Sequence, residues 1–239
     1  MLNPIYVLYL PDKSKMGEVS VIFAYLVFFN VVLSYGMETA FFRFYNSEDN
    51  KKNVVSTSTI SLFWSSLVFL VLGLLFRNNL ASWSDIKVEY ITYTIWILTL
   101  DALAIIPFSK LRAERKPIMY AAIKIGNVSI SLLLTLFFLA ILPELVATKP
   151  DGIFSMIYFI NYQIGYIFIS FIVASLATFL VLIPNYTKIA WNFDKALWKK
   201  MMTYGLPILF AGIAFAINEH FDKILLDWMH VPMSEIGAY

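Results

Sequence analysis

Six long apolar stretches with almost no charge run along this chain, and each is long enough to cross a membrane as a helix. They are residues 19–37, 54–76, 90–108, 118–142, 162–183 and 201–226. The first, second and fifth contain no charged side chain. A helix that crosses the bilayer hydrocarbon needs about 20 mainly apolar residues, which is more than most buried helices of soluble proteins contain. The pattern therefore predicts six membrane spans.

The composition of the chain leads to the same prediction. Of its 239 residues, 60% are hydrophobic and 14% are charged, whereas typical soluble domains have about 25% charged residues. Aromatic side chains near the ends of the stretches resemble the belts found at membrane surfaces; they include Trp83, Tyr90, Trp191, Trp198 and Trp228. We expect an all-α membrane protein, folded as a multi-span helical bundle.

Two segments outside the six stretches are also apolar. Residues 153–183 are uncharged but too long for one straight span, so we expect an interfacial segment before residue 162. Residues 1–10 are too short to cross. They are either an interfacial start or the end of a further span, and we favour the second. We therefore expect the chain to be truncated at its start. Because residues 234–239 contain no helix stop signal, we expect it to be truncated at its end as well.

The distribution of Lys and Arg predicts the orientation of the spans. If the first span runs inward, the inside segments 43–53, 109–117 and 185–200 contain three, four and four Lys or Arg residues. The outside segments contain six in total, against these eleven. Connections on the cytoplasmic side carry the excess of positive charge in membrane proteins. We therefore expect these three segments to face the cytoplasm.

Several functional classes lack support in the sequence. There is no cysteine, and His220 and His230 are not at ligand spacing from each other, so neither a disulfide nor a zinc site is expected. The formal charge of +2 gives no indication of nucleic-acid binding. The sequence contains no Walker A loop, nucleophile elbow, metalloprotease helix or dinucleotide fingerprint. We predict neither a cofactor nor an enzymatic activity.

Asp101 and Lys124 are ionisable groups inside predicted spans. Such a group costs at least about 2.5 kcal/mol at the centre of a bilayer, so it needs a partner, water or a function. Asp101 lies seven residues before the inner end of its span and Lys124 six residues after the start of the next. Both are thus roughly 10 Å from the same face. An ion pair between them is allowed, either as a lock between helices or as part of a transport cavity.

Polar residues also follow helical spacing on two of the spans. One stripe contains Asn30, Ser34 and Glu38, and Tyr45 continues it if the helix extends. The other consists of Tyr120, Lys124, Asn127, Ser131 and Thr135. Small polar residues also serve as helix-packing contacts, but two such stripes favour a hydrated cavity between the helices.

The last stretch has a polar cluster near its outer end. It contains Asn218, Glu219, Asp222 and Lys223. Glu219 and Lys223 are four residues apart, so they can pair on one helix face. The cluster is either such an ion-paired helix end or a cation or substrate site. Pro207, just inside this stretch, is expected to bend the helix.

Three segments together resemble a known family. They are residues 34–45 (SYGMETAFFRFY), 100–124 (LDALAIIPFSKLRAERKPIMYAAIK) and 193–226 (FDKALWKKMMTYGLPILFAGIAFAINEHFDKILL). In order and spacing they resemble the polysaccharide flippases, also labelled lipopolysaccharide or O-antigen biosynthesis proteins, of the multidrug/oligosaccharidyl-lipid/polysaccharide exporter superfamily. The resemblance runs over essentially the whole chain.

The resemblance implies two six-helix lobes around a central cavity that opens alternately to each side of the membrane. Residues 1–184 would be the N-terminal transmembrane lobe, with its first helix incomplete. Residues 185–200 would be the cytoplasmic interlobe linker, and residues 201–239 the start of a truncated C-terminal lobe. The implied location is the bacterial inner (plasma) membrane.

The implied substrate is an undecaprenyl-pyrophosphate sugar, a lipid-linked oligosaccharide. In such flippases, basic cavity residues are thought to meet the pyrophosphate; here the candidates are Arg43 and Lys124, with Asn127 and Ser131 on the same stripe as Lys124. Arg43 has an alternative reading as a positive-inside anchor. The resemblance offers Glu38, Asp101, Glu219 and Asp222 as ion-coupling or gating groups.

Two other functions stay open. A cation-coupled multidrug antiporter of the same superfamily would depend on acidic cavity residues more than on basic ones. The other function is that of a membrane enzyme or assembly partner in envelope glycan synthesis. Besides the substrate and membrane lipids, the implied partners include a glycan polymerase or ligase.

Overall fold

The computed structural model describes residues 3–10, 12–150, 152–187 and 189–238. The side chains of residues 3–5, 220 and 221 lie outside this description, and so does any ligand role for His220. All regular elements in the described part are helices, and six of them are long and apolar enough to cross a membrane. The expected all-α, multi-span bundle is confirmed.

The spanning helices extend beyond the predicted stretches at both ends in most cases. The first span is formed by α2 (Lys13–Ser34) and α3 (Met37–Ser47), and the next two by α4 (Lys51–Ser84) and α5 (Val88–Ala113). The fourth combines α6 (Pro117–Leu136), the π-helical turn η1 (Phe137–Ile141) and α7 (Leu142–Thr148). The last two lie in α8 (Gln163–Thr187) and α9 (Lys195–Trp228). Short helices α1 (Asn3–Tyr9), η2 (Ile153–Met156) and α10 (Met233–Ile236) complete the fold.

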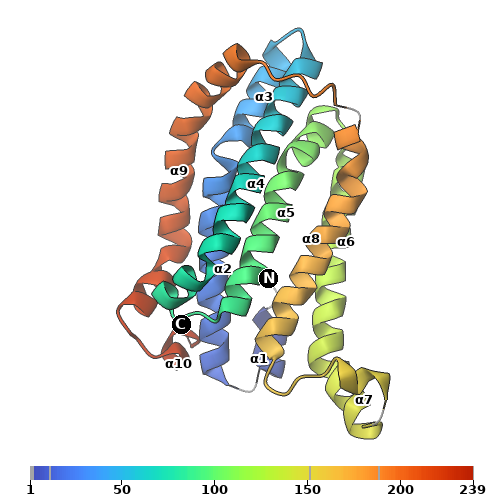
Figure 1. Cartoon of the computed structure of the whole chain (residues 1–239), viewed down its shortest axis with the longest axis vertical. Helices are drawn as coiled ribbons and strands as arrows, with labels where there is room; N and C mark the ends of the chain where they lie inside the picture. The colour runs from blue at the N-terminus through green and yellow to red at the C-terminus, as the bar shows by residue number, and fades with distance from the viewer. Residues whose placement is uncertain (1–2, 11, 151, 188, 239) are drawn as a thin grey trace.

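Helix α5 is the most buried of the spans and lies in the middle of the bundle. It packs against α4 on one side and against α8 on the other, while α6 packs on the far side of α8. Helix α9 lies at the opposite edge, against α2 and α3 (Figure 1). It continues as a helix through Pro207.

The first span is broken where α2 meets α3. Tyr35 and Gly36 both have a left-handed backbone, with φ of 34° and 70°, a conformation that costs residues other than glycine about 1–2 kcal/mol. The break lies against Gly205 of α9, where a Cβ added at Gly36 would be 2.1 Å from the Gly205 carbonyl oxygen. The two glycines therefore permit close backbone contact between α9 and the first span.

The outer surface of the bundle is apolar. Many large side chains on the spans are exposed, among them Val68 and Leu75 of α4, Leu133 of α6, Leu180 of α8 and Phe210 of α9. Extended apolar surface of this kind is unusual on soluble monomers, and it is the surface that lipid requires. The segment 153–160 after α7 is also largely exposed and apolar, and α8 begins at Gln163, close to the predicted start of that span.

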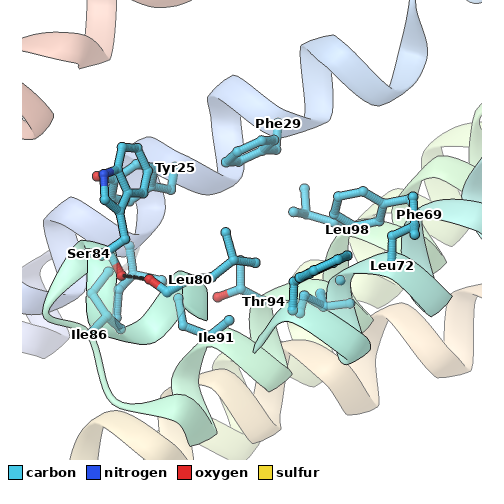
Figure 2. A pocket seen from close by; sticks show the side chains of 15 residues that line it. Tyr25, Phe29, Phe69, Leu72, Leu80, Ser84, Ile86, Ile91, Thr94 and Leu98 are labelled. Carbon is cyan, nitrogen blue, oxygen red and sulfur yellow. Dashed lines mark hydrogen bonds between the residues drawn. The ribbon is translucent and has the colours of Figure 1, made fainter. Parts of the chain in front are cut away.

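An apolar cavity of about 390 Å³ lies between α2, α4 and α5 (Figure 2). Its walls include Phe29 of α2, Leu72 of α4 and Leu98 of α5. The cavity lies toward the end of the bundle where α4 ends and α5 begins. Trp83 and Ser84 line it at that end.

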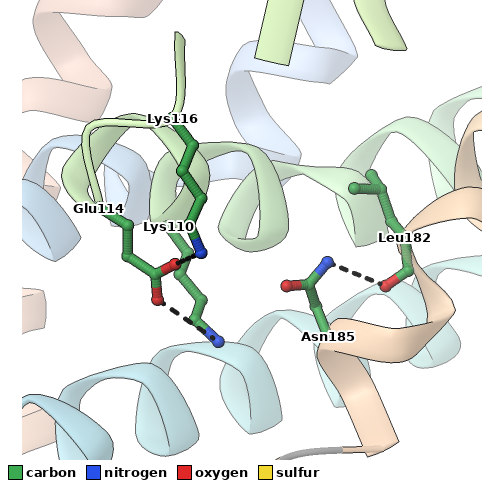
Figure 3. A network of polar contacts seen from close by, with 5 residues as sticks. All are labelled: Lys110, Glu114, Lys116, Leu182 and Asn185. Atoms are coloured by element: carbon green, nitrogen blue, oxygen red, sulfur yellow. Dashed lines mark hydrogen bonds and ion pairs between the residues drawn. The ribbon is translucent and has the colours of Figure 1, made fainter. Parts of the chain in front are cut away.

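The segments 43–53, 109–117 and 185–200 meet at one end of the bundle, which we call the basic end. A surface pocket there is lined by Lys51 and Lys52 from the first segment, Lys110 and Glu114 from the second, and Thr187 and Ile189 from the third. Glu114 pairs with Lys116 at 2.7 Å and with Lys110 at 3.8 Å (Figure 3). Asn185 lies nearby and donates to the carbonyl of Leu182. The grouping agrees with the expected placement of these segments on one side of the membrane.

The connection between α8 and α9 is shorter than predicted, because both helices extend into residues 185–200. It is bound to the start of α4. Asn192 accepts from and donates to Ser56 Oγ, at 2.7 and 2.9 Å, and the backbone N–H of Asp194 donates to Thr57. The Asp194 carboxylate accepts from the backbone of Ala196 and Leu197 and caps α9.

Candidate functional site

A polar cavity of about 350 Å³ lies between the first span, α5, α6 and α8. It contains residues from both of the polar stripes recognised in the sequence. Its polar and charged lining consists of Asn30, Glu38, Asp101, Arg112, Tyr120, Lys124, Asn127, Ser175 and Thr178. Two of these side chains are acidic and two are basic, so their formal charges balance.

Arg112 occupies the part of the cavity nearest the basic end. Its guanidinium forms an ion pair with Glu38, which is in the first turn of α3 directly after the helix break. The same group lies 4.9 Å from the ring centre of Phe42 and 5.2 Å from that of Tyr120. One cation thus connects α3, α5 and α6, and both members of the ion pair remain partly exposed.

Deeper in the cavity, α8 supplies hydroxyl groups to the polar residues of α5 and α6. Ser175 donates to the Asp101 carboxylate at 2.8 Å. Asn127 donates to Thr178 at 2.9 Å, and Thr178 donates in turn to a carbonyl of its own helix. Each of these bonds gives the Asp101 or Asn127 side chain a partner on α8 and so restricts its orientation.

Lys124 has a different environment. Its ammonium lies 4.5 Å from the ring centre of Phe108, an attractive arrangement of a cation and an aromatic face. The described ion pairs join Lys110 and Lys116 to Glu114, and Arg112 to Glu38, so none includes Lys124. The allowed pair between Asp101 and Lys124 is therefore not formed, although both side chains line the same cavity. Their charges are available to a third group.

The other predicted residues lie outside the cavity lining. Arg43 is exposed, with its guanidinium 4.2 Å from the ring centre of Tyr204 on α9. Ser131 is buried, and its hydroxyl has no hydrogen-bond partner in the structure. Glu219 is exposed on α9, and Asp222 accepts from the backbone of Lys223. Among the described residues, Glu219 and Lys223 do not form the ion pair that their spacing allows.

Arg112 is a charged cavity residue that the sequence analysis does not predict. It is near the end of α5, in a segment with three other basic residues, and hydropathy assigns that whole segment to a connecting loop. The signal that identifies it is positional. Asp101 to Arg112 is eleven residues, or about three helical turns, so extending the helix past residue 108 places both side chains on one face.

The cavity combines unpaired charge, hydrogen-bonding groups and aromatic rings inside an apolar bundle. This set suits a polar or charged solute that must be kept away from lipid. Among the described residues, no three His, Asp or Glu side chains are grouped as a metal site would require. Arg112 and Glu38 of its lining are partly exposed, and the hydroxyl groups of Ser175 and Thr178 are hydrogen-bonded to Asp101 and Asn127.

Comparisons of the chain with protein-family models, with curated proteins and with solved structures find no match.

Proposed function

We propose that this protein is a flippase that moves lipid-linked oligosaccharides, with undecaprenyl-pyrophosphate sugars as substrates, across the bacterial inner membrane by alternating access. The observation that carries the proposal is the polar cavity lined by Lys124, an exposed side chain that takes part in none of the described ion pairs. A pyrophosphate is a compact anion, and a lysine ammonium forms charge-assisted hydrogen bonds with it. The cavity lies between helices with apolar outer surfaces, which suits a substrate with a polar head and a hydrocarbon tail.

Alternating access requires helices that change their relative positions, and the first span has a feature that permits this. The break at Tyr35 and Gly36 separates α2 from α3, and Glu38 follows it by two residues. Broken helices beside a substrate cavity are common in transporters. We infer that movement of α3 makes and breaks the Glu38–Arg112 ion pair, which closes the cavity toward the basic end.

The test uses the purified chain in nanodiscs with undecaprenyl pyrophosphate as the probe, and native mass spectrometry measures bound lipid. Lys124→Gln is expected to weaken binding about tenfold to a hundredfold, since a charge-assisted hydrogen bond contributes about 1.5–3 kcal/mol. Lys124→Arg should retain most of the affinity. The matched control is Lys199→Gln, an exposed lysine at the basic end of α9. Equal affinities for the Lys124→Gln variant and the wild type would contradict the proposal.

A cation-coupled antiporter is the second candidate, and the hydrogen bond from Ser175 to Asp101 favours it. A carboxylate inside a span is the group that an antiporter needs for proton or sodium exchange. Uptake of a cationic dye into proteoliposomes distinguishes the two functions. Dye exchange that Asp101→Asn abolishes and Lys124→Gln leaves intact supports the antiporter. Glycan export that fails with Lys124→Gln but not with Asp101→Asn supports the flippase. It also supports the proposed partnership with an envelope glycan polymerase or ligase.

A further inference from the structure

The apolar cavity between α2, α4 and α5 is separate from the polar cavity and plays no part in the proposed transport. Its walls are formed almost entirely by aliphatic and aromatic side chains, such as Phe29, Phe69, Leu72 and Leu98. At about 390 Å³ it is within the range of small-molecule sites, about 300–1,000 Å³. An apolar space of this size suits a hydrocarbon chain better than water, because it offers water few hydrogen-bonding partners.

The cavity is open to the exterior along α4. Leu72, Phe76 and Trp83 line it and are also exposed, at 49%, 55% and 65%. Its lining on α4 extends from Phe69 to Ser84, about 22 Å at 1.5 Å per residue. One leaflet has a hydrocarbon depth of about 15 Å, half of the roughly 30 Å core. The cavity is therefore longer than one leaflet is deep, so it is long enough for a chain that enters from the end opposite the basic end.

The outer end of this cavity continues into a polar pocket. The two share Trp83 and Ser84. The Trp83 and Trp228 rings pack edge to face at 5.7 Å, and Trp228 donates to the hydroxyl of Tyr25 at 3.1 Å. Aromatic side chains of this kind mark the level of lipid head groups. The cavity thus changes from apolar to polar at the depth where a lipid changes from chain to head group.

The polar pocket is acidic. Asp85, Asp227 and His230 line it, and its described lining contains neither Lys nor Arg. Burial raises the pKa of Asp227, and the nearby Asp85 carboxylate raises it further, while His230 lowers it in part. Two carboxylates that repel each other are stabilised by a cation between them. The charge of the pocket therefore favours an ammonium group and disfavours a head group whose only charge is a phosphate.

We propose that the apolar cavity holds one hydrocarbon chain of a bilayer lipid whose ammonium-bearing head group lies against Asp85 and Asp227. The occupant is thus a lipid of the phosphatidylethanolamine type. The proposal does not depend on the transported substrate, because no lining residue is shared with the polar cavity that contains Lys124.

The experiment uses the full chain in nanodiscs that contain phosphatidylethanolamine with a diazirine in one acyl chain. Irradiation crosslinks the chain to the side chains around it, and mass spectrometry locates the sites. We expect labelling concentrated on cavity-lining residues of α4 and α5, at least fivefold above labelling of the exposed faces of α8. Phosphatidylglycerol with the same chain should label these residues several-fold less.

Matched variants separate the cavity from the general lipid surface. Leu72→Trp fills the cavity and should reduce its labelling at least fivefold, while Leu75→Trp, on the same helix but outside the lining, should leave it unchanged. Leu80→Trp fills the other end of the cavity and provides a second test if the Leu72 variant does not fold. The double variant Asp85→Asn/Asp227→Asn should reduce the ratio of cavity labelling by phosphatidylethanolamine to that by phosphatidylglycerol to near one.

Uniform labelling of all exposed helix faces in the wild type would overturn the proposal, because the cavity would then hold no lipid preferentially. Equal cavity labelling by both lipids in the wild type would overturn it as well, because the acidic pocket would then select no head group. Either result leaves the binding test of Lys124 with undecaprenyl pyrophosphate unaffected, so failure of the two proposals can be distinguished.

Discussion

At the scale of single residues, the charged groups of the polar cavity differ in how fully their charges are compensated. Arg112 has a carboxylate and two aromatic rings around it, whereas Lys124 has one ring and, among the described residues, no carboxylate within ion-pair distance. Arg112 is thus suited to hold helices together, and Lys124 is suited to meet a ligand. The two cations should therefore respond differently to substitution.

Arg112→Ala should lower the stability of the protein by about 1–3 kcal/mol. A partly exposed ion pair contributes up to about 1 kcal/mol, and each cation–π contact adds about 0.5–1 kcal/mol. Thermal unfolding in detergent measures the change. Arg77→Ala, an exposed arginine on α4, is the control and should have little effect. A larger loss of stability in the Arg77 variant than in the Arg112 variant would refute this ranking.

At the scale of helices, the junction of α2 and α3 depends on the absence of a side chain at Gly36. Gly36→Ala should destabilise the protein by more than about 1–2 kcal/mol, the cost of the left-handed backbone alone, because the new Cβ would also overlap the Gly205 carbonyl. Gly126→Ala is the control. A Cβ there meets nothing within 4 Å, and alanine favours a helix by roughly 0.5–1 kcal/mol. Thermal stability should therefore fall for the first variant only.

The start of α9 should respond to pH through Asp194. Hydrogen bonds from Leu197, Asn53 and Ala196 lower the pKa of this carboxyl below its ordinary value. The ionised carboxylate therefore stabilises the fold fully above about pH 4, the pKa of an unfolded aspartate. This contribution is lost as the pH falls through the lowered pKa of the folded state.

Asp194→Asn keeps a cap that accepts hydrogen bonds but removes the charge. The wild type should unfold at a higher temperature than this variant at pH 7, and the difference should shrink steadily below pH 4. Asp49→Asn, an exposed aspartate at the same end, should show no such trend. A difference in unfolding temperature between the wild type and Asp194→Asn that grows toward low pH would contradict this prediction.

The spans could be predicted from hydropathy because each contains a long uncharged run, but their ends could not. The helices α4 and α5 continue into Ser84 and Ala113, since polar residues remain helical beyond the hydrocarbon. For the same reason, hydropathy assigns Arg112 to a connecting loop, although it lies on helix α5. The break at Tyr35 and Gly36 has a local signal in the glycine, but its position depends on the contact with Gly205, 169 positions along the chain. No local pattern indicates the π-helical turn at Phe137–Ile141.

The polar stripes predicted where the cavity lies, but not all of the residues that line it. Asn30, Glu38, Lys124 and Asn127 line it as spacing indicates. Ser131 is one turn farther along the stripe of α6 and is buried instead; α8 packs against α6. Spacing identifies a helix face, but the neighbouring helix decides where that face meets open space.

At the scale of the whole molecule, the basic end should face the cytoplasm, since three basic segments meet there and positive charge is retained on that side. The chain contains no cysteine, so single introduced thiols report position without background. Ser47→Cys lies at the basic end, in the last residue of α3, and Ser82→Cys lies near the opposite end of α4; both sites are exposed.

A membrane-impermeant maleimide should label the Ser82→Cys protein in intact cells and the Ser47→Cys protein only in inverted vesicles. The charge distribution alone makes this prediction, so it tests orientation independently of any transport activity. It also fixes the direction of the cavity, because Arg112 and Glu38 are at its basic end. Labelling of Ser47→Cys in intact cells would reverse the orientation. A gate formed by Arg112 and Glu38 would then close the cavity toward the outside.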